Sequence, residues 1–291
     1  MVKKISDLYL EARRAFLAVE DPQTASLLAR NLLAFVTGKS QEAILADREM
    51  YVSGETCEKM EDAVRRILAE EPLAYIMGEW DFYGMRLSVD RNVLIPRDDT
   101  CAVTALAIKN ALFLQQDPRI LDLCTGSGCI GLAVANRVKD AKVTLADVSR
   151  EALAVAKKNV TATKLSARVS CVQANALEDP APFLGKFDMI ISNPPYITAR
   201  EMQELPSSVK DYEPHLALYG GEDGLDFYRS IADKYRAALK PGGYLCFEFG
   251  MGQGDAVCEI LEQNGFVILE RTKDFNEVER AVLAQYGRKE S

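Results

Sequence analysis

The tetrapeptide Asn193-Pro194-Pro195-Tyr196 brings together residue types that could act directly on a substrate. It ends an apolar run, residues 187–192, that is typical of a buried strand. Consecutive prolines make a rigid corner and lack backbone donors, so the side-chain oxygen of Asn193 and the carbonyl oxygen of Pro194 remain as acceptors. They could take both hydrogens of a planar NH2 group and stabilise charge developing on its nitrogen, with Tyr196 as an aromatic wall. We predict that Asn193, Pro194 and Tyr196 are catalytic and that all four residues bind the substrate.

A second motif, the turn Cys124-Thr125-Gly126-Ser127-Gly128, lies between an apolar run at 119–123 and a helical pattern. Its glycines permit a tight turn and close approach of a ligand to the backbone, and the spacing to Gly131 alone leaves a dinucleotide open. Asp122 lies just before the turn, where its carboxylate would repel a pyrophosphate. The same carboxylate could hold the ammonium group of S-adenosylmethionine through water or a backbone amide. The alternative is a strand-end residue that ties the turn down.

Polar residues also follow the next two predicted strands. Asp147, before Val148, ends the run 142–147, where open α/β sheets place a carboxylate on ribose hydroxyls. Asn175, before Ala176, follows 168–173 and could meet an adenine edge, although asparagine is also a common turn former. The residues predicted to bind S-adenosylmethionine are Asp122, Cys124, Thr125, Gly126, Ser127, Gly128, Asp147, Val148, Asn175, Ala176 and Asn193.

The elements that must position these residues are strands alternating with helices. The predicted strands are 119–123, 142–147, 168–173, 187–192, 243–249, 266–271 and 279–284. Helical patterns fill most of the gaps between them, which indicates a doubly wound α/β sheet with helices on both faces.

The region before this sheet has a different pattern. Apolar residues recur there at helical spacing, at Ile5, Leu8, Tyr9, Ala12, Phe16 and Val19. Asp21-Pro22 predicts a helix start and Gly38 a helix end, whereas Tyr83-Gly84 predicts a hairpin turn. We expect a helical bundle over 1–77 that packs structurally or docks a protein partner, a β-hairpin linker over 78–95, and a catalytic domain over 96–291.

Composition narrows the functional classes. The chain has 48% hydrophobic residues and a net charge of −8, so a basic surface that captures nucleic acid is not expected. Its apolar runs are too short for a bilayer, and its first residues lack a signal-peptide core, which predicts a cytoplasmic protein without membrane contact. Seven cysteines without a Cys-x-x-Cys pair and the single His215 predict no metal site.

Together these motifs resemble the HemK/PrmC family of protein-(glutamine-N5) methyltransferases, which modify peptide chain release factors. The glycine turn and the acceptor tetrapeptide are shared with many nitrogen methyltransferases, whereas the segments 71–78, 93–97 and 212–218 resemble this family in particular. The resemblance covers nearly the whole chain. It implies a seven-stranded Rossmann-like class I methyltransferase domain joined by a β-hairpin linker to a small helical N-terminal domain. It also implies S-adenosylmethionine as cofactor, S-adenosylhomocysteine as product, and the glutamine of the Gly-Gly-Gln motif in class-1 release factors as substrate. We expect a monomer without direct nucleic-acid contact.

Departures from the family pattern affect several positions. The family usually has glycine at Cys124, aspartate at Asn175 and Pro-Glu-Thr-Glu where this chain has Asp98-Asp99-Thr100-Cys101. Segment 274–280 is a loosened form of the family's Asp-Leu-x-Gly-x-Asp-Arg. None of these changes touches the acceptor tetrapeptide.

Other functions fit part of the pattern. A ribosomal-protein glutamine methyltransferase would use the same site chemistry, and an adenine amine presents a nucleic-acid methyltransferase with the same planar NH2 group. A nicotinamide-dependent oxidoreductase would leave Asn193-Pro194-Pro195-Tyr196 unexplained. A non-catalytic module would bind a release factor or a ribosome without transferring a methyl group.

Overall fold

The computed structural model describes residues 2–287, which form two compact units. The first comprises Met1–Gly78 with Ser207–Tyr212, and the second comprises Glu79–Pro206 with Glu213–Ser291. Ser207–Tyr212 thus groups with the helical unit, whereas the sequence placed it in the catalytic domain. One contact that holds it there is a hydrogen bond from the Tyr212 hydroxyl to the Ala69 carbonyl oxygen. Across residues 2–287, no helix is both long and apolar enough to cross a membrane.

The first unit is a helical bundle with a short two-stranded sheet. Its elements are β1 (Lys3–Lys4), α1 (Ile5–Phe16), α2 (Pro22–Thr37), α3 (Gln41–Ala46), β2 (Tyr51–Val52), α4 (Gly54–Leu68), α5 (Leu73–Met77) and α10 (Ser207–Lys210). Asp21 caps α2 by accepting hydrogen bonds from the backbone of Gln23 and Thr24, and Gly38 ends that helix in the left-handed conformation, as predicted. Of the predicted apolar face of α1, Ile5, Leu8, Ala12 and Phe16 are buried and Tyr9 is partly buried, but Val19 lies beyond the helix and is 63% exposed.

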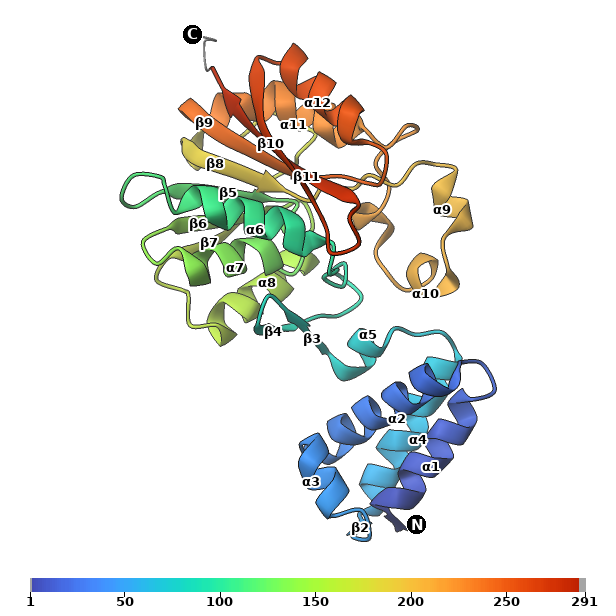
Figure 1. Cartoon of the computed structure of the whole chain (residues 1–291). Helices are drawn as coiled ribbons and strands as arrows, with labels where there is room; N and C mark the ends of the chain where they lie inside the picture. The colour runs from blue at the N-terminus through green and yellow to red at the C-terminus, as the bar shows by residue number, and fades with distance from the viewer. Residues whose placement is uncertain (1, 288–291) are drawn as a thin grey trace. The chain divides into compact units, whose positions relative to one another are not determined.

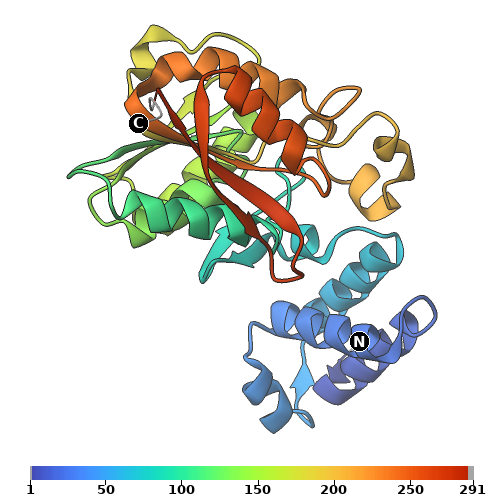
Figure 2. The same cartoon turned by 45° about the horizontal axis from the view of Figure 1, so that its top comes forward.

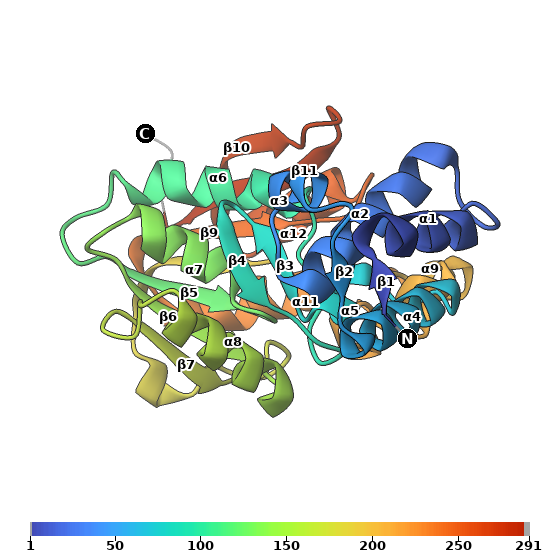
Figure 3. The ribbon, with the colours of Figure 1, turned by 90° about the horizontal axis from the view of Figure 1, so that it is seen from below.

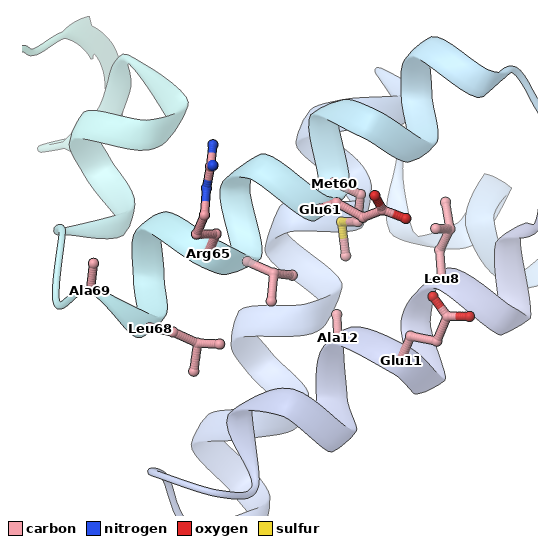
Figure 4. Close-up of a pocket in the computed structure, with 9 residues that line it drawn as sticks. Leu8, Glu11, Ala12, Met60, Glu61, Arg65, Leu68 and Ala69 are labelled. Atoms are coloured by element: carbon pink, nitrogen blue, oxygen red, sulfur yellow. The ribbon is translucent and has the colours of Figure 1, made fainter. Parts of the chain in front are cut away.

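A hollow lies between α1 and α4 in this unit (Figure 4). Apolar side chains from both helices line it, among them Leu8 and Met60, and the carboxylates Glu11 and Glu61 lie beside them. The Lys3 ammonium bridges these carboxylates, with its Nζ 2.7 Å from Glu11 and 3.1 Å from Glu61. The hollow therefore combines an apolar floor with partly neutralised acidic groups.

The second unit is built on a seven-stranded sheet in the order β10-β11-β9-β8-β5-β6-β7 (Figure 1). Its strands are β5 (Arg119–Leu123), β6 (Lys142–Asp147), β7 (Val169–Gln173), β8 (Phe187–Ser192), β9 (Leu239–Glu248), β10 (Phe266–Lys273) and β11 (Glu279–Tyr286). The strands β5 to β9 pair in parallel, whereas β11 is antiparallel to both β9 and β10. A hairpin of β3 (Glu79–Phe82) and β4 (Met85–Ser88) precedes this sheet, with the predicted turn at Tyr83-Gly84.

Helices cover both faces of the sheet (Figures 1 and 2). The helices of the second unit are α6 (Thr100–Ala111), α7 (Cys129–Arg137), α8 (Arg150–Ala162), α9 (Glu201–Glu204), α11 (Asp226–Lys234) and α12 (Gly254–Gln263), with short 3-10 turns at Pro182–Leu184, His215–Ala217 and Tyr235–Ala238. One hydrophobic core lies under α6, α7 and α8, and a second lies under α11 and α12. Figure 3 shows α7 and α8 over β5, β6 and β7. The predicted seven-stranded α/β fold with helices on both faces is therefore confirmed.

Candidate active site

Parallel pairing gathers the predicted site at one edge of the sheet. The strands β5, β6, β7 and β8 are neighbours in parallel, so the residues that follow their carboxyl ends meet at that edge. A cavity opens there within the second unit. The predicted residues that line it are Cys124, Thr125, Gly126, Ser127, Asp147, Val148, Asn175, Ala176, Asn193 and Pro195.

The turn after β5 has a left-handed backbone at Cys124 (φ 61°), Gly126 (φ 53°) and Gly128 (φ 86°). Gly128 lies outside the cavity lining and is the N-cap residue before α7, where an added Cβ would meet the Leu145 side chain at 3.0 Å. Cys124 takes the conformation that favours glycine, at a cost of about 1–2 kcal/mol. The family's usual glycine at this position thus has a conformational reason, and the cysteine preserves the turn.

Asp122 is fully buried and does not line the cavity. Its Oδ2 accepts hydrogen bonds from the Thr125 hydroxyl at 2.6 Å and from the Gly131 backbone at 2.8 Å. Burial raises the pKa of this carboxyl to about 7. The described contacts are therefore those of a residue that ties the turn to α7, which is the alternative left open by the sequence. Its direct contact with a cofactor stays a prediction.

Asp147 and Asn175 do line the cavity, and both hold loop backbone. Asp147 accepts hydrogen bonds from the backbone of Ser149 at 3.0 Å and of Gly126 at 2.9 Å, while burial raises its pKa. Ser149 in turn caps α8, as predicted. Asn175 accepts from the Leu177 backbone and donates to Glu178, which is a turn arrangement. The roles of Asp147 and Asn175 toward ribose and adenine stay predictions.

The acceptor tetrapeptide follows β8 directly, and its members lie in different surroundings. Asn193 and Pro195 line the cavity, whereas Pro194 and Tyr196 do not. The Asn193 Nδ2 donates to the Thr100 hydroxyl at 3.3 Å, and its Oδ1 accepts no hydrogen bond from the residues that the structure describes. Tyr196 packs against the core under α11 and α12, and its carbonyl oxygen accepts a hydrogen bond from the Gln253 side chain at 3.1 Å. The catalytic roles of Pro194 and Tyr196 stay predictions.

One wall of the cavity comes from segments that the sequence analysis did not place in the site. Pro96 and Arg97 line this wall, and the buried carboxylate of Glu213 secures it. Glu213 accepts a hydrogen bond from the Ile95 backbone at 3.1 Å and forms an ion pair with Arg97. The family signatures over 93–97 and 212–218 thus meet in space. Their distance in the sequence concealed this contact.

The electrostatics of the cavity distinguish between ligand classes. Among the described lining residues, the charged side chains are Asp147 and Arg97, and Arg97 is neutralised by Glu213. A pyrophosphate would find no unpaired cation in this lining and would be repelled by the Asp147 carboxylate, whereas the cationic sulfur and the ammonium group of S-adenosylmethionine would not. The donor set therefore fits S-adenosylmethionine better than a dinucleotide.

Comparison with known proteins agrees with this geometry. The PrmC N-terminal domain family matches residues 9–78, and the methyltransferase small domain family matches residues 102–208. A release factor glutamine methyltransferase of Clostridium acetobutylicum is 39% identical over 256 residues, which cover 88% of this chain and 90% of the relative. One of Chlorobaculum tepidum is 37% identical and covers 94% of each chain. The chain belongs to the release factor glutamine methyltransferase family.

The methyltransferase also shares its fold with solved structures. A methyltransferase from Pyrococcus furiosus aligns with a TM-score of 0.51 at 18% identity, over 78% of this chain and 100% of the other. The HemK/PrmC resemblance is confirmed, and both the family and the fold are those of S-adenosylmethionine-dependent enzymes. The methyltransferase is therefore an enzyme of class I fold. Membership of this methyltransferase family excludes the two alternatives of a nicotinamide-dependent oxidoreductase and a non-catalytic binding module.

Proposed function

We propose that this methyltransferase transfers a methyl group from S-adenosylmethionine to the side-chain amide nitrogen of the glutamine in the Gly-Gly-Gln motif of class-1 release factors. The names of the relatives support this substrate. The structural observation that carries the proposal is Asn193, which lines the cavity with its NH2 group bonded to Thr100 and its Oδ1 without a donor among the described residues. A planar NH2 group is the complementary ligand for that oxygen.

The residues that would hold the cofactor lie along the edge from β5 to β7. Asp147 would accept hydrogen bonds from the ribose hydroxyls, and Asn175 with Ala176 would border the adenine. The turn Thr125-Gly126 lets backbone approach the amino-acid end closely. When bound, S-adenosylmethionine supplies an electrophilic methyl group on a cationic sulfur.

The chain's own contribution is orientation. An amide nitrogen is a weak nucleophile because its lone pair is delocalised into the carbonyl group. Oxygen acceptors at Asn193 and Pro194 would fix both N–H bonds, direct the lone pair at the methyl carbon and stabilise positive charge developing on nitrogen. As the C–N bond forms, the electron pair of the breaking C–S bond stays on sulfur. One amide proton then leaves to solvent.

Two titratable groups in or near the tetrapeptide, Tyr196 and Cys124, agree with orientation rather than strong-base catalysis. Burial raises the pKa of the Tyr196 phenol and of the Cys124 thiol. Both groups therefore remain protonated at neutral pH and cannot remove a proton from the amide. Their role near the substrate is limited to packing and hydrogen bonding.

The helical unit would bind the release factor through the hollow between α1 and α4, where Leu68 is 42% exposed. We also propose that the enzyme acts as a cytoplasmic monomer. Its net charge of −8 supports the further proposal that it makes no direct contact with nucleic acid. Leu68→Glu should raise the KM for the release factor about tenfold and leave the KM for S-adenosylmethionine unchanged. An unchanged KM for the release factor would refute docking at this hollow.

The decisive experiment follows the methyl label. The enzyme is incubated with radiolabelled S-adenosylmethionine and, separately, a release factor, the same factor with its Gly-Gly-Gln glutamine replaced, ribosomal protein and duplex DNA. We expect label on the unmodified release factor alone. Label that survives replacement of the glutamine, or that appears on DNA, would refute the proposed substrate.

A variant then tests the residue that carries the proposal. Asn193→Ala should lower kcat at least about a hundredfold, the scale of a lost charge-stabilising group. Its Kd for S-adenosylmethionine, measured by calorimetry, should stay close to that of wild type. Asn110→Ala is the matched control, because Asn110 donates to the Leu106 carbonyl oxygen away from the cavity. Equal losses of turnover and cofactor affinity in Asn193→Ala would assign Asn193 to the cofactor or to the fold.

A further inference from the structure

A buried carboxyl group lies beside the acceptor tetrapeptide and has no part in the chemistry described above. Glu248 ends β9, which pairs in parallel with β8 so that Phe247 is opposite Ser192. The next residues along these strands are Glu248 and Asn193. Glu248 is 1% exposed, and its Oε2 has no hydrogen-bond partner among the described residues.

Three side chains from separate elements meet at this point. Thr100 is the first residue of α6 and is 2% exposed. Its hydroxyl accepts a hydrogen bond from the Asn193 Nδ2 at 3.3 Å. Thr100 and Asn193 are also the side chains whose hydrogen bonding lowers the pKa of the Glu248 carboxyl, against the larger effect of burial, so this carboxyl lies beside both. The NH2 group of Asn193 is thus engaged on the side that faces Thr100 and Glu248.

The chemistry of the partners decides which way the Asn193 amide points. A hydroxyl can donate or accept, so Thr100 alone would tolerate either the NH2 group or the oxygen of Asn193. An ionised carboxylate can only accept. In the hydrogen bond between Asn193 and Thr100, Nδ2 is the donor and the Thr100 oxygen the acceptor, which leaves the Thr100 hydrogen for the neighbouring Glu248 carboxylate. The Asn193 Oδ1 must then point away from both.

A protonated Glu248 keeps this polarity when its proton is on Oε2. Burial raises the pKa of Glu248 to about 8, against the hydrogen bonds from Thr100 and Asn193, with Arg280 and Asp99 as the nearby charges. In the neutral form the proton can occupy Oε2, which has no other partner among the described residues. The other carboxyl oxygen remains an acceptor for Thr100 in both forms.

Neighbouring ion pairs hold Thr100 in place. Asp99, the residue before Thr100, pairs with Arg280 of β11 at 2.8 Å. Arg280 also pairs with Asp274 at 2.9 Å, and its neighbour Ala281 is opposite Glu248 in the sheet. The start of α6 is therefore tied to β11, which pairs with β9, the strand that carries Glu248.

We infer that Thr100 and Glu248 are positioning residues of the methyl transfer, which turn the Asn193 amide so that its oxygen meets the NH2 group of the substrate. The inference rests on the proposed function for its substrate. Loss of either residue frees the Asn193 amide to present its NH2 group to the substrate NH2, a pairing of two donors.

The first test separates this role from a structural one through kinetics. Thr100→Val should lower kcat about tenfold, the scale of one lost hydrogen bond made in the transition state, and Thr100→Ser should restore it. The Kd for S-adenosylmethionine should change less than about twofold in both variants. Thr104→Val is the matched control, since Thr104 is buried one helical turn later and donates to the Thr100 carbonyl oxygen at 2.8 Å. Equal kcat losses in Thr100→Val and Thr104→Val would overturn the inference.

Glu248→Met extends the test to the other positioning residue. Alone it should lower kcat by a similar factor, and combined with Thr100→Val it should cause little further loss, because the hydrogen bonds act as one unit. Fully multiplicative losses in the double variant would contradict a shared role. Thermal unfolding of each variant confirms that the protein measured is folded.

A substrate-free measurement distinguishes this inference from the proposed function. In asparagine-labelled protein, the Asn193 Nδ2 resonance is identified by its loss in Asn193→Ala. Its hydrogen exchange with water should accelerate about tenfold in Thr100→Val and stay unchanged in Thr104→Val. If the wild type fails to methylate a release factor but this difference is present, the substrate is wrong and the positioning role stands. If methylation occurs while exchange and kcat are insensitive to Thr100→Val, the positioning role is wrong and the function stands.

Discussion

Replacing Glu213 with alanine should destabilise the catalytic unit more than any removal of a surface charge. The Glu213 side chain is 1% exposed, and it accepts from the backbone of Ile95, a residue that is itself 5% exposed. An unpaired buried N–H costs about 1–3 kcal/mol. The Arg97 side chain is 39% exposed, so water compensates most of its lost ion pair and about 1 kcal/mol is added. We expect a loss of about 2–4 kcal/mol in the free energy of unfolding.

The assay for this prediction is urea unfolding followed by the fluorescence of Trp80. Trp80 is the only tryptophan of the chain and lies in β3, within the same unit as Glu213, so the signal reports on that unit. Glu213→Gln keeps an acceptor oxygen and should lose only about 1 kcal/mol. The control is Glu204→Ala, whose ion pair with Arg200 is exposed and should contribute less than about 0.5 kcal/mol. A loss in Glu213→Ala no larger than that of the control would refute the reasoning.

Two further predictions concern the stability of the same unit and use the same urea assay. Gly128→Ala should lower the free energy of unfolding by about 2 kcal/mol or more, because its φ of 86° disfavours a side chain and Leu145 lies 3.0 Å from the added Cβ. The control Gly84→Ala has φ 75° and open space around the added Cβ, so it should lose only about 1 kcal/mol. Equal losses in the two variants would show that the contact with Leu145 is unimportant. Burial raises the pKa of Glu248 from 4.5 to about 8 and that of Asp122 from 3.8 to about 7, so the folded state binds these two protons more tightly than the unfolded state. The free energy of unfolding should therefore fall as the pH rises from the lower to the higher pKa of each group. The slope should be at most about 1.4 kcal/mol per pH unit for each group. Glu248→Gln should flatten part of that slope, and an unchanged slope would show that Glu248 does not cause it.

The strands were predictable where their ends carry a local signal. The bounds of β5, β6 and β8 agree with the sequence, because a polar residue, a glycine turn or a proline corner follows each apolar run. The strand β9 was predicted from residue 243 but begins at Leu239, across Pro241 and Gly242. Leu239 is paired with Phe187 before the register shifts at Met189. That early pairing depends on the neighbouring strand, which local turn signals do not reveal.

The site was predictable where a residue's chemistry stands out at a strand end. Asn193 and Asp147 met that condition, and both line the cavity. Glu248 also ends a strand, but it follows an apolar run without a turn motif, and only the pairing of β9 with β8 brings it beside Asn193. Thr100 comes from a helix start 93 residues before Asn193. Contacts between distant segments therefore supply what residue types alone could not, namely the direction of the Asn193 amide.

One departure from the family pattern, at Asp99, also lies among the contacts that set the direction of the Asn193 amide. Asp99 stands where the family usually has another residue, and it forms an ion pair with Arg280 in the loosened segment 274–280. The first and last residues of that segment, Asp274 and Arg280, also bind each other. Asp99, a substituted position, is thus joined by ion pairs to Arg280 and Asp274, which keep the family pattern, and these contacts fix the start of α6, which supplies Thr100 to the Asn193 amide. We therefore expect the acceptor tetrapeptide to depend on this chain of contacts, because it needs a defined amide direction rather than a strong base.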